Sequence, residues 1–205
     1  MTAEGNGRVA RVALPVLGIA ALCGLIIAGV HEMAAERIGM NRERLTLATV
    51  MDVMPLSHDN DLFADRLEVS DAAAFGSADP VSIFRARLKG QPAGLVFTPV
   101  PARGYNGRID LAIGLSLAGE LTGVRVTRHG ETPGLGDQVH QSHSDWIRQF
   151  DGRSLENTPE QAWAVRGDGG KFDQISGATI TPRGLIQAVR GTLEYYRRNR
   201  DSLYR

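Results

Sequence analysis

The sequence predicts an α+β protein, with one apolar helix near the amino terminus followed by a single domain of antiparallel strands and flanking helices. The first observation is an uncharged apolar run over residues 12–30. The second is strict alternation of apolar and small or polar residues over 109–118, which is typical of a strand with one buried face. The third is apolar spacing of helical period in two later segments, 139–150 and 182–196.

Composition places the chain among ordinary folded proteins. It has 205 residues, of which 42% are hydrophobic and 22% charged, and this length suits one or two domains. The 23 basic and 23 acidic residues give a formal net charge of zero. A nucleic-acid partner is therefore not expected, because such proteins carry a basic surface.

The run over residues 12–30 is close to the roughly 20 residues that span a bilayer as a helix. It exceeds the core of a signal peptide, and no small-residue cleavage site follows in residues 31–36. A buried core helix is the alternative, but such a helix normally shows a polar face. We expect an uncleaved transmembrane anchor. The only cysteine, Cys23, lies inside it and can form no disulfide within the domain.

The charges around the predicted anchor do not settle its orientation. Two arginines precede it and three follow it, but glutamates dilute the second group. Because orientation follows the excess of positive charge on the cytoplasmic side, this near balance leaves both orientations open.

The segment after the anchor, residues 31–80, predicts a linker of helix and loop. Apolar spacing over 41–54 indicates a helix that ends at Pro55. The polar stretch 57–61 then indicates a loop. No metal site is expected there, since nothing forces its side chains to converge.

The middle of the chain predicts a sheet. Residues 81–89 and 94–100 are rich in strand-forming residues, and 90–93 suits a hairpin turn between them. The alternating strand over 109–117 is followed by a turn at 119–120 and by a strand over 124–127, which indicates an antiparallel hairpin.

The next segment, Glu131-Thr132-Pro133-Gly134-Leu135-Gly136, combines a proline with two glycines at a strand end. Such a loop can fold back tightly and expose its backbone amides to a ligand. A plain turn between a strand and a helix is the alternative.

Two helices are predicted to complete the domain. The first buries one face, made of Val139, His143, Trp146, Ile147 and Phe150. The second has Thr181 as its N-cap and Pro182 at its first helical position. His140 and His143 have a spacing that metal ligands use, but no third ligand of matching type lies nearby, so no metal is expected.

Ser176-Gly177-Ala178-Thr179, just before the last helix, is the segment that carries the most information. Alone, these four small residues would be an ordinary turn. Gly177 and Ala178 leave the hydroxyl of Thr179 open to approach, and the helix that follows offers free amides and a positive dipole end to a phosphate. A phosphate-linked group could therefore be held here.

Taken together, the motifs resemble one family over essentially the whole chain. The apolar run, the Gly104-Tyr105-Asn106-Gly107 turn, the 131–136 loop and Asp173-Gln174-Ile175-Ser176-Gly177-Ala178-Thr179 occur in this order. This pattern resembles the G subunit of the bacterial Rnf ion-translocating electron transport complex. The C subunit of the sodium-pumping NADH:quinone reductase shares the domain and is the closest alternative.

The resemblance implies an FMN-binding domain and a covalent flavin. It implies that Thr179 carries FMN through a phosphoester bond, installed by a flavin transferase that recognises Asp173, and that Ser176, Gly177 and Ala178 complete the acceptor motif. Packing against the flavin is expected from the 131–136 loop, with Glu131, Thr132, Gly134 and Leu135 as its contacts. Four aromatic residues could stack on the ring or pack in the core: Tyr105, Trp146, Trp163 and Phe172.

The resemblance also implies an organisation and a function. Residues 1–11 would be cytoplasmic, 12–30 the anchor, 31–80 the linker and 81–205 a periplasmic FMN-binding domain on a bacterial inner membrane. The chain would carry electrons between other subunits of a ferredoxin:NAD oxidoreductase complex and have no catalytic activity of its own. An anchored binding module without flavin is a further alternative.

Overall fold

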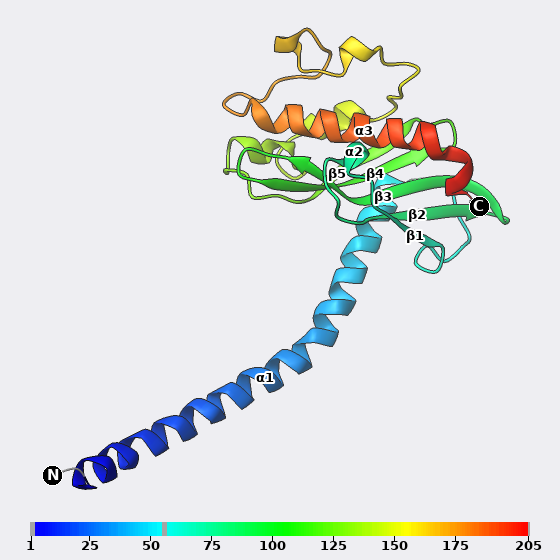
Figure 1. Ribbon diagram of the computed structural model, residues 1–205. Coiled ribbons are helices and arrows are strands. Elements are labelled where there is room, and N and C mark those ends of the chain that lie inside the picture. Colours follow the sequence, from blue (N-terminus) through cyan, green and yellow to red (C-terminus); the bar gives the residue numbers. More distant parts are fainter. Residues whose placement is uncertain (1–2, 55–56, 205) are drawn as a thin grey trace. The chain divides into compact units, whose positions relative to one another are not determined.

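The computed structural model describes residues 3–54 and 57–204, with the side chains of 3–15, 32–33 and 35–44 left outside that description. The chain divides into two compact units, residues 1–47 and 48–205. Helix α1 (Ala3–Val53) contributes to both. The second unit contains all the remaining elements, and the candidate site lies within it (Figure 1).

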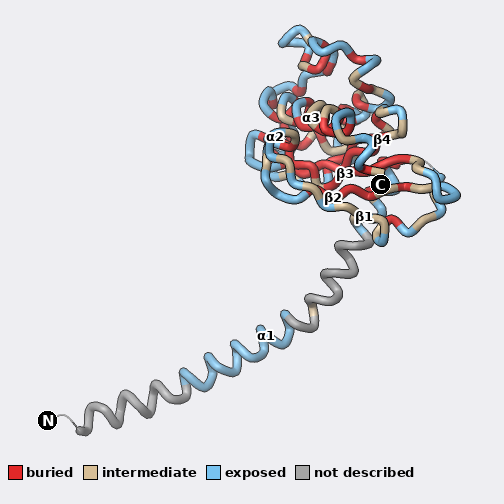
Figure 2. Tube along the Cα trace, turned by 45° about the vertical axis from the view of Figure 1, so that its right-hand side comes forward, coloured by how far each residue is buried: buried red, intermediate tan, exposed pale blue. Residues whose placement is uncertain are grey.

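In the first unit, the side chains of residues 16–31 are exposed along α1 (Figure 2). They include large apolar side chains such as Leu25, at 71% exposure, and Ile27, at 69%. A search of the described residues finds no helix with the length and hydropathy of a membrane span. The first four residues of the predicted anchor, 12–15, have side chains outside the described part.

In the second unit, the described residues form an antiparallel sheet of five strands in simple chain order. The strands are β1 (Arg66–Val69), β2 (Val81–Leu88), β3 (Gln91–Arg103), β4 (Arg108–Ser116) and β5 (Leu121–Arg128). In the register, Phe97 faces Ile83 on one side and Ile113 on the other. The expected antiparallel sheet is confirmed, and β3 is longer than the predicted strand over 94–100.

Residues 48–80 lie in the same compact unit as the sheet. They supply the edge strand β1 and the short helix α2 (Ala72–Phe75), neither of which the sequence pattern indicated. Strand β1 reads Arg-Leu-Glu-Val, and its four residues are too few to establish a period. The folded unit therefore begins well before residue 81.

Helix α3 (Ile180–Leu203) lies across one face of the sheet (Figure 1). Its buried residues Leu185, Val189 and Leu193 join the main core formed with β2 to β5. A second cluster, which contains Val53 and Met54 at the end of α1, packs against Ala112 and other buried residues. The two clusters make the sheet buried on both faces.

The predicted helix over 139–150 is wrong. Two short 3₁₀ helices stand there instead, η1 (Gly136–Val139) and η2 (Trp146–Phe150). Between them, the Ser144 hydroxyl donates to the Gln138 carbonyl at 2.5 Å and accepts from the Trp146 amide at 3.1 Å. Serine side chains that bond the backbone in this way compete with continuous helix. The predicted burial of Trp146, Ile147 and Phe150 is nevertheless confirmed.

The predicted start of the last helix is also wrong. Helix α3 begins at Ile180, with Thr179 at the N-cap position, so Thr181 and Pro182 lie inside the first turn. Thr181 is fully buried and its hydroxyl bonds a side chain from another loop rather than capping its own helix. Two further 3₁₀ helices, η3 (Glu160–Ala162) and η4 (Arg166–Asp168), lie between η2 and α3.

Candidate functional site

The acceptor segment forms a tight turn directly before α3. The Ala178 amide donates to the Ile175 carbonyl at 3.0 Å, which closes the turn over Ser176 and Gly177. Gly177 has φ of +75°, a left-handed conformation that a type II turn requires at that position. Ser176 and Gly177 are exposed, whereas Ala178 is buried and fastens the turn to the core.

Thr179 occupies the N-cap position of a 24-residue helix but does not cap it. Its backbone is helical, with φ of −80° and ψ of −34°, and its side chain makes no capping hydrogen bond. N-cap threonines ordinarily use an extended backbone and bond an amide of the first turn. The residue is exposed, so its hydroxyl stands free beside amides that have no partner within the helix.

The 131–136 loop folds back on itself and reaches the acceptor turn. The Leu135 amide donates to the Thr132 carbonyl at 3.1 Å, and Gly134 takes φ of +78°. A Cβ atom placed on Gly177 would lie 2.8 Å from Cδ2 of Leu135. The two motifs, more than forty residues apart in the sequence, are therefore in contact. Such contact is required if both motifs are to bind the same ligand.

Glu131 is buried beneath this loop, at 7% exposure. Its Oε2 accepts a hydrogen bond from the Thr181 hydroxyl at 2.5 Å, and its Oε1 accepts one from the backbone amide of Asn106 at 3.0 Å. Both carboxylate oxygens are thus bonded to the protein itself. The carboxylate joins the loop to the first turn of α3 and to the 104–107 turn.

The 104–107 turn, which connects β3 to β4, forms the third wall of the site. The Gly104 amide donates to the Gly107 carbonyl at 2.7 Å. The Asn106 side-chain amide donates to the Thr132 hydroxyl at 3.0 Å. That hydroxyl keeps its own hydrogen available for a further acceptor. The turn also presents Tyr105, which is 71% exposed.

Three large side chains remain exposed on the segments that meet at the acceptor turn. Ile180 follows Thr179 directly and is 44% exposed, and Leu135, packed at Gly177, is 43% exposed. Tyr105 belongs to the turn that bonds Thr132. Exposed large apolar side chains on adjoining segments are typical of a surface that binds a ligand or a partner.

The other three aromatic residues considered for ring stacking are in the core. Trp146, Trp163 and Phe172 are at most 8% exposed. The ring centroids of Phe172 and Phe150 lie 4.7 Å apart, and those of Phe172 and Trp163 lie 5.5 Å apart. These rings pack against one another, so the core-packing interpretation is confirmed for them.

Asp173 is held by its backbone and leaves its carboxylate accessible. Its amide donates to Oε1 of Gln149 at 2.8 Å, and its carbonyl accepts the indole of Trp146 at 2.7 Å. The carboxylate, on a side chain 51% exposed, pairs with Arg166 at 2.9 Å. An exposed ion pair of this kind is weak and can be opened by another protein.

A cluster of three histidines lies beside the loop. The ring centroids of His129 and His140 are 5.6 Å apart, and those of His140 and His143 are 5.8 Å apart. Burial lowers the pKa of His140, and the neighbouring charges of His129 and His143 lower it further. Within the described part of the chain, neither these histidines nor any other three His, Cys, Asp or Glu side chains are arranged so that they could hold a metal ion.

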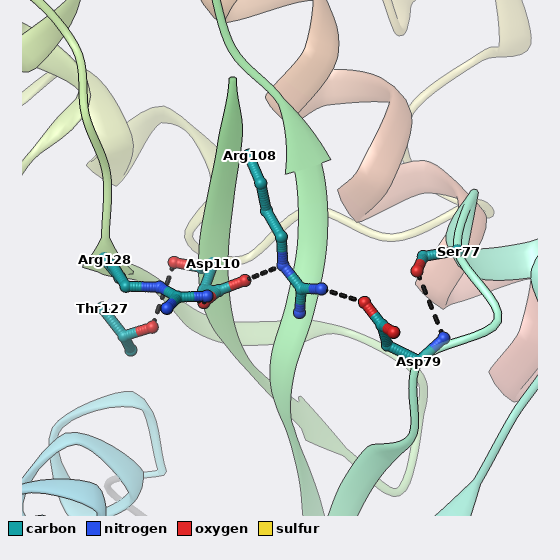
Figure 3. A network of polar contacts seen from close by, with 6 residues as sticks. All are labelled: Ser77, Asp79, Arg108, Asp110, Thr127 and Arg128. Carbon is teal, nitrogen blue, oxygen red and sulfur yellow. Dashed lines mark hydrogen bonds and ion pairs between the residues drawn. The ribbon is translucent and has the colours of Figure 1, made fainter. Parts of the chain in front are cut away.

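A polar network joins the start of β4, which follows the 104–107 turn, to the end of β5 and to Asp79 (Figure 3). Arg108 bonds Asp110 at 2.5 Å and pairs with Asp79, while Arg128 bonds the other oxygen of Asp110 at 2.8 Å. Burial opposes the charge on Arg108, but the two carboxylates outweigh it and raise the pKa of Arg108. The network connects the first residues of β4 to the last residue of β5.

A cavity of about 720 Å³ lies along α3. Helix α2, the end of β3 and the small residues Gly184, Ala188 and Gly191 of α3 line it. As far as the described residues show, its lining includes none of the side chains predicted to contact flavin. The cavity does reach Gly107, so it borders the 104–107 turn that forms the third wall of the site.

The sequence pattern had not indicated three of the residues that shape the site. Asn106 bridges two loops, Ile180 adds exposed apolar surface, and Thr181 anchors the buried carboxylate. Thr181 before Pro182 has the sequence signature of an N-cap, so nothing local reveals its true partner fifty residues away.

Comparison with known proteins identifies the class to which this fold and site belong. Residues 104–194, which run from the β3–β4 turn through most of α3, match the FMN-binding domain family. The chain therefore carries an FMN-binding domain.

Relatives of similar length identify the family more closely. The G subunit of the ion-translocating oxidoreductase complex of Shewanella loihica is 37% identical over 90% of this chain and 87% of its own. The corresponding G subunits of Pseudoalteromonas atlantica and Pseudomonas aeruginosa are 39% and 36% identical, over 87% and 91% of this chain and 84% and 88% of their own. The chain belongs to this family, the G subunits of ion-translocating oxidoreductase complexes, as the sequence motifs indicated.

Proposed function

We propose that this protein is a membrane-anchored electron carrier that holds FMN by a phosphoester bond to Thr179. One observation carries the proposal. Thr179 is exposed at the start of a 24-residue helix and makes no capping hydrogen bond, and the adjoining segments carry the exposed side chains of Ile180, Leu135 and Tyr105. A covalently attached, partly apolar phosphate ester would use each of these features.

Different residues of the site would bind the phosphate and the ring system of the flavin. The free amides and positive dipole end of α3 favour the phosphate next to Thr179. Leu135, Ile180 and Tyr105 offer apolar cover to the ring system, and the Thr132 hydroxyl is free to donate. When bound, FMN supplies the capacity to accept and pass on electrons, while the protein supplies position and electrostatics.

Attachment requires a flavin transferase, which must reach the Thr179 hydroxyl. Ser176 and Gly177 are exposed next to it, and the Asp173 carboxylate lies half-exposed on the same segment. This accessibility supports Asp173 as the acidic residue that the transferase recognises.

The setting that we propose is a bacterial inner membrane, with residues 12–30 as a single-pass anchor and the FMN-binding domain in the periplasm. The exposed apolar side chains along residues 16–31 support this placement. A covalent tether also suits a compartment that has no flavin pool from which a lost cofactor could be replaced.

The partners that we propose are the other subunits of an Rnf-type ferredoxin:NAD oxidoreductase complex, between which this chain would pass electrons. The relatives are named as G subunits of ion-translocating oxidoreductase complexes. These names favour this assignment over a component of the sodium-pumping quinone reductase. We expect no catalytic activity from the isolated chain.

Expression with and without a flavin transferase tests the proposal. After denaturing electrophoresis, the wild-type band should show flavin fluorescence only when the transferase is present. Thr179→Ala should be dark. Ser202→Ala, which removes an exposed hydroxyl at the far end of α3 and outside the acceptor motif, should stay fluorescent. A dark wild-type band would refute the covalent flavin.

A further inference from the structure

We propose that Glu131 is a positioning residue, which sets the Thr179 hydroxyl relative to the two loops that would cover the flavin. The inference rests on the proposed function and deepens it. The sequence motif had suggested Glu131 as a direct flavin contact. The geometry instead shows that Glu131 links three segments by hydrogen bonds: its own loop, the first turn of α3 and the 104–107 turn. We call this link the tie.

The first step is the pair of hydrogen bonds that the carboxylate accepts. One comes from the hydroxyl of Thr181, two residues after Thr179 in the first turn of α3, at 2.5 Å. The other comes from the Asn106 amide, in the β3–β4 turn, at 3.0 Å. Hydrogen bonds to a charged acceptor are stronger than neutral ones, and burial strengthens them further.

The second step is the space that the neighbouring backbone leaves for the carboxylate. A Cβ atom on Gly104 would overlap Oε1 of Glu131, and one on Gly136 would overlap Oε2. Two separate glycines thus let the backbone approach the same carboxylate from opposite segments. Such close packing fixes the group in one position.

The third step connects this tie to the acceptor hydroxyl. Thr179 lies on the same helical start as Thr181, and Leu135 and Thr132 lie on the loop that begins with Glu131. The bond between Glu131 and Thr181 therefore sets the spacing between Thr179 and both side chains. Glu131 itself, at 7% exposure, lies below the surface that a ligand would contact.

Two substitutions should break the tie, and one should preserve it. Glu131→Ala removes both acceptors. Thr181→Val keeps the buried shape but leaves one carboxylate oxygen without its donor. Glu131→Gln can still accept from Asn106 and can donate its amide to the Thr181 oxygen, so the geometry survives without the charge.

The matched control is Thr192→Val. Thr192 is likewise fully buried on α3, and its hydroxyl donates to the Ala188 carbonyl at 2.9 Å. It lies three turns along the helix from Thr181 and contacts neither loop of the site. Its loss should lower the melting temperature without changing the acceptor geometry.

The measurement is the rate at which a purified flavin transferase, with FAD, labels each folded full-length variant. Glu131→Ala and Thr181→Val should each be labelled about tenfold more slowly than wild type, and the double variant no more slowly than Glu131→Ala. Glu131→Gln and Thr192→Val should be labelled at the wild-type rate. Circular dichroism establishes that every variant is folded.

A second measurement needs no flavin. Hydrogen exchange at the Asn106 amide should be faster in Thr181→Val than in wild type, and unchanged in Thr192→Val. A wild-type chain that takes no flavin would refute the proposed function. Hydrogen exchange would still show whether Glu131 links Thr181 to Asn106. Unchanged exchange in Thr181→Val, wild-type labelling of Glu131→Ala, or labelling of Glu131→Gln as slow as Glu131→Ala would overturn the positioning role.

Discussion

Thr179 differs from an ordinary helix N-cap because its side chain makes no hydrogen bond to the first turn of its own helix. A helix of 24 residues gains about 1 kcal/mol from a capping hydroxyl, and α3 forgoes that bond. The stability of α3 comes instead from its buried face. A hydroxyl with no structural task is free to serve as an attachment point.

Two features of Gly177 predict that no other residue can replace it: its positive φ and the lack of space for a side chain. Its φ of +75° is unfavourable for any L residue by about 1–2 kcal/mol. A Cβ atom there would also press on Leu135. Gly177→Ala should therefore lower the free energy of unfolding, measured by urea denaturation, and slow flavin labelling.

Gly152→Ala is the matched control for that prediction. Gly152 has nearly the same φ, +73°, lies outside the site, and a Cβ atom on it would meet no heavy atom within 4 Å. This variant should lose a similar amount of stability and leave the Leu135 contact intact. If Gly152→Ala slows labelling as much as Gly177→Ala does, the contact with Leu135 does not explain the slower labelling.

The lowered pKa of His140 predicts that the free energy of unfolding depends on pH. Its pKa in the folded protein lies below the ordinary value of 6.5, first because of burial and then because of His129 and His143. The unfolded chain thus binds this proton more tightly, so its contribution to stability is greatest above pH 6.5 and falls as the pH drops below it.

The measurement is chemical denaturation at a series of pH values on either side of that value. Between about pH 7.5 and about pH 5.5, His140→Gln should lose less free energy of unfolding than wild type, because its side chain does not titrate. An equal loss in both proteins would show that other groups determine the pH dependence.

At the scale of elements, α3 packs closely against its neighbours through two glycines one heptad apart. A Cβ atom on Gly184 would overlap the Arg103 carbonyl oxygen at the end of β3, and one on Gly191 would overlap that of Ala74 in α2. These contacts place the helix, and with it Thr179, against the sheet.

Gly184→Ala should accordingly destabilise the protein by about 1–3 kcal/mol, although the same change in an exposed helix usually stabilises it. Thermal or urea denaturation measures the effect. Gln187→Ala, on an exposed position of the same helix, should change stability by no more than about 0.5 kcal/mol. A stabilised Gly184→Ala would contradict the packing described here.

The elements that the sequence predicted well are those with a clear period. Residues 109–117 alternate strictly, and β4 appears there, but both of its faces are buried where the alternation predicted one, since Ala112 and Gly114 pack beneath the end of α1. The segment 139–150 also has helical spacing, but the Ser144 side chain bonds the backbone and breaks the helix. Local side-chain competition of this kind is invisible to periodicity.

The acceptor motif could be recognised from sequence, but the way in which the site is assembled could not. Contact between Leu135 and Gly177, and the bond from Thr181 to Glu131, depend on how α3 docks on the sheet. The position of Thr181 before a proline even favoured the wrong role for it. Such long-range contacts have no signature within a short window of residues.

At the scale of the whole molecule, the compact unit over residues 48–205 should fold by itself. It contains the sheet, both core clusters and the acceptor turn. A fragment that starts at Ala48 should give a cooperative thermal transition and accept flavin at the wild-type rate. Failure to fold would show that the first unit contributes to the core.

The same fragment tests the proposed anchor. The full-length chain should sediment with membranes and resist a carbonate wash, whereas the fragment from Ala48 should be recovered in the soluble fraction. The apolar side chains of residues 16–31 give the physical reason. A full-length chain that is released by carbonate would contradict an integral anchor.

The central claim is a single covalent bond between Thr179 and a flavin phosphate, and peptide mapping by mass spectrometry tests it most directly. The chain would be expressed with a flavin transferase, digested and sequenced by fragmentation. We expect one modified peptide, heavier by one FMN less one water, with the added mass on Thr179. An unmodified Thr179 peptide, or the same mass on Ser176 or another residue, would contradict the proposed bond.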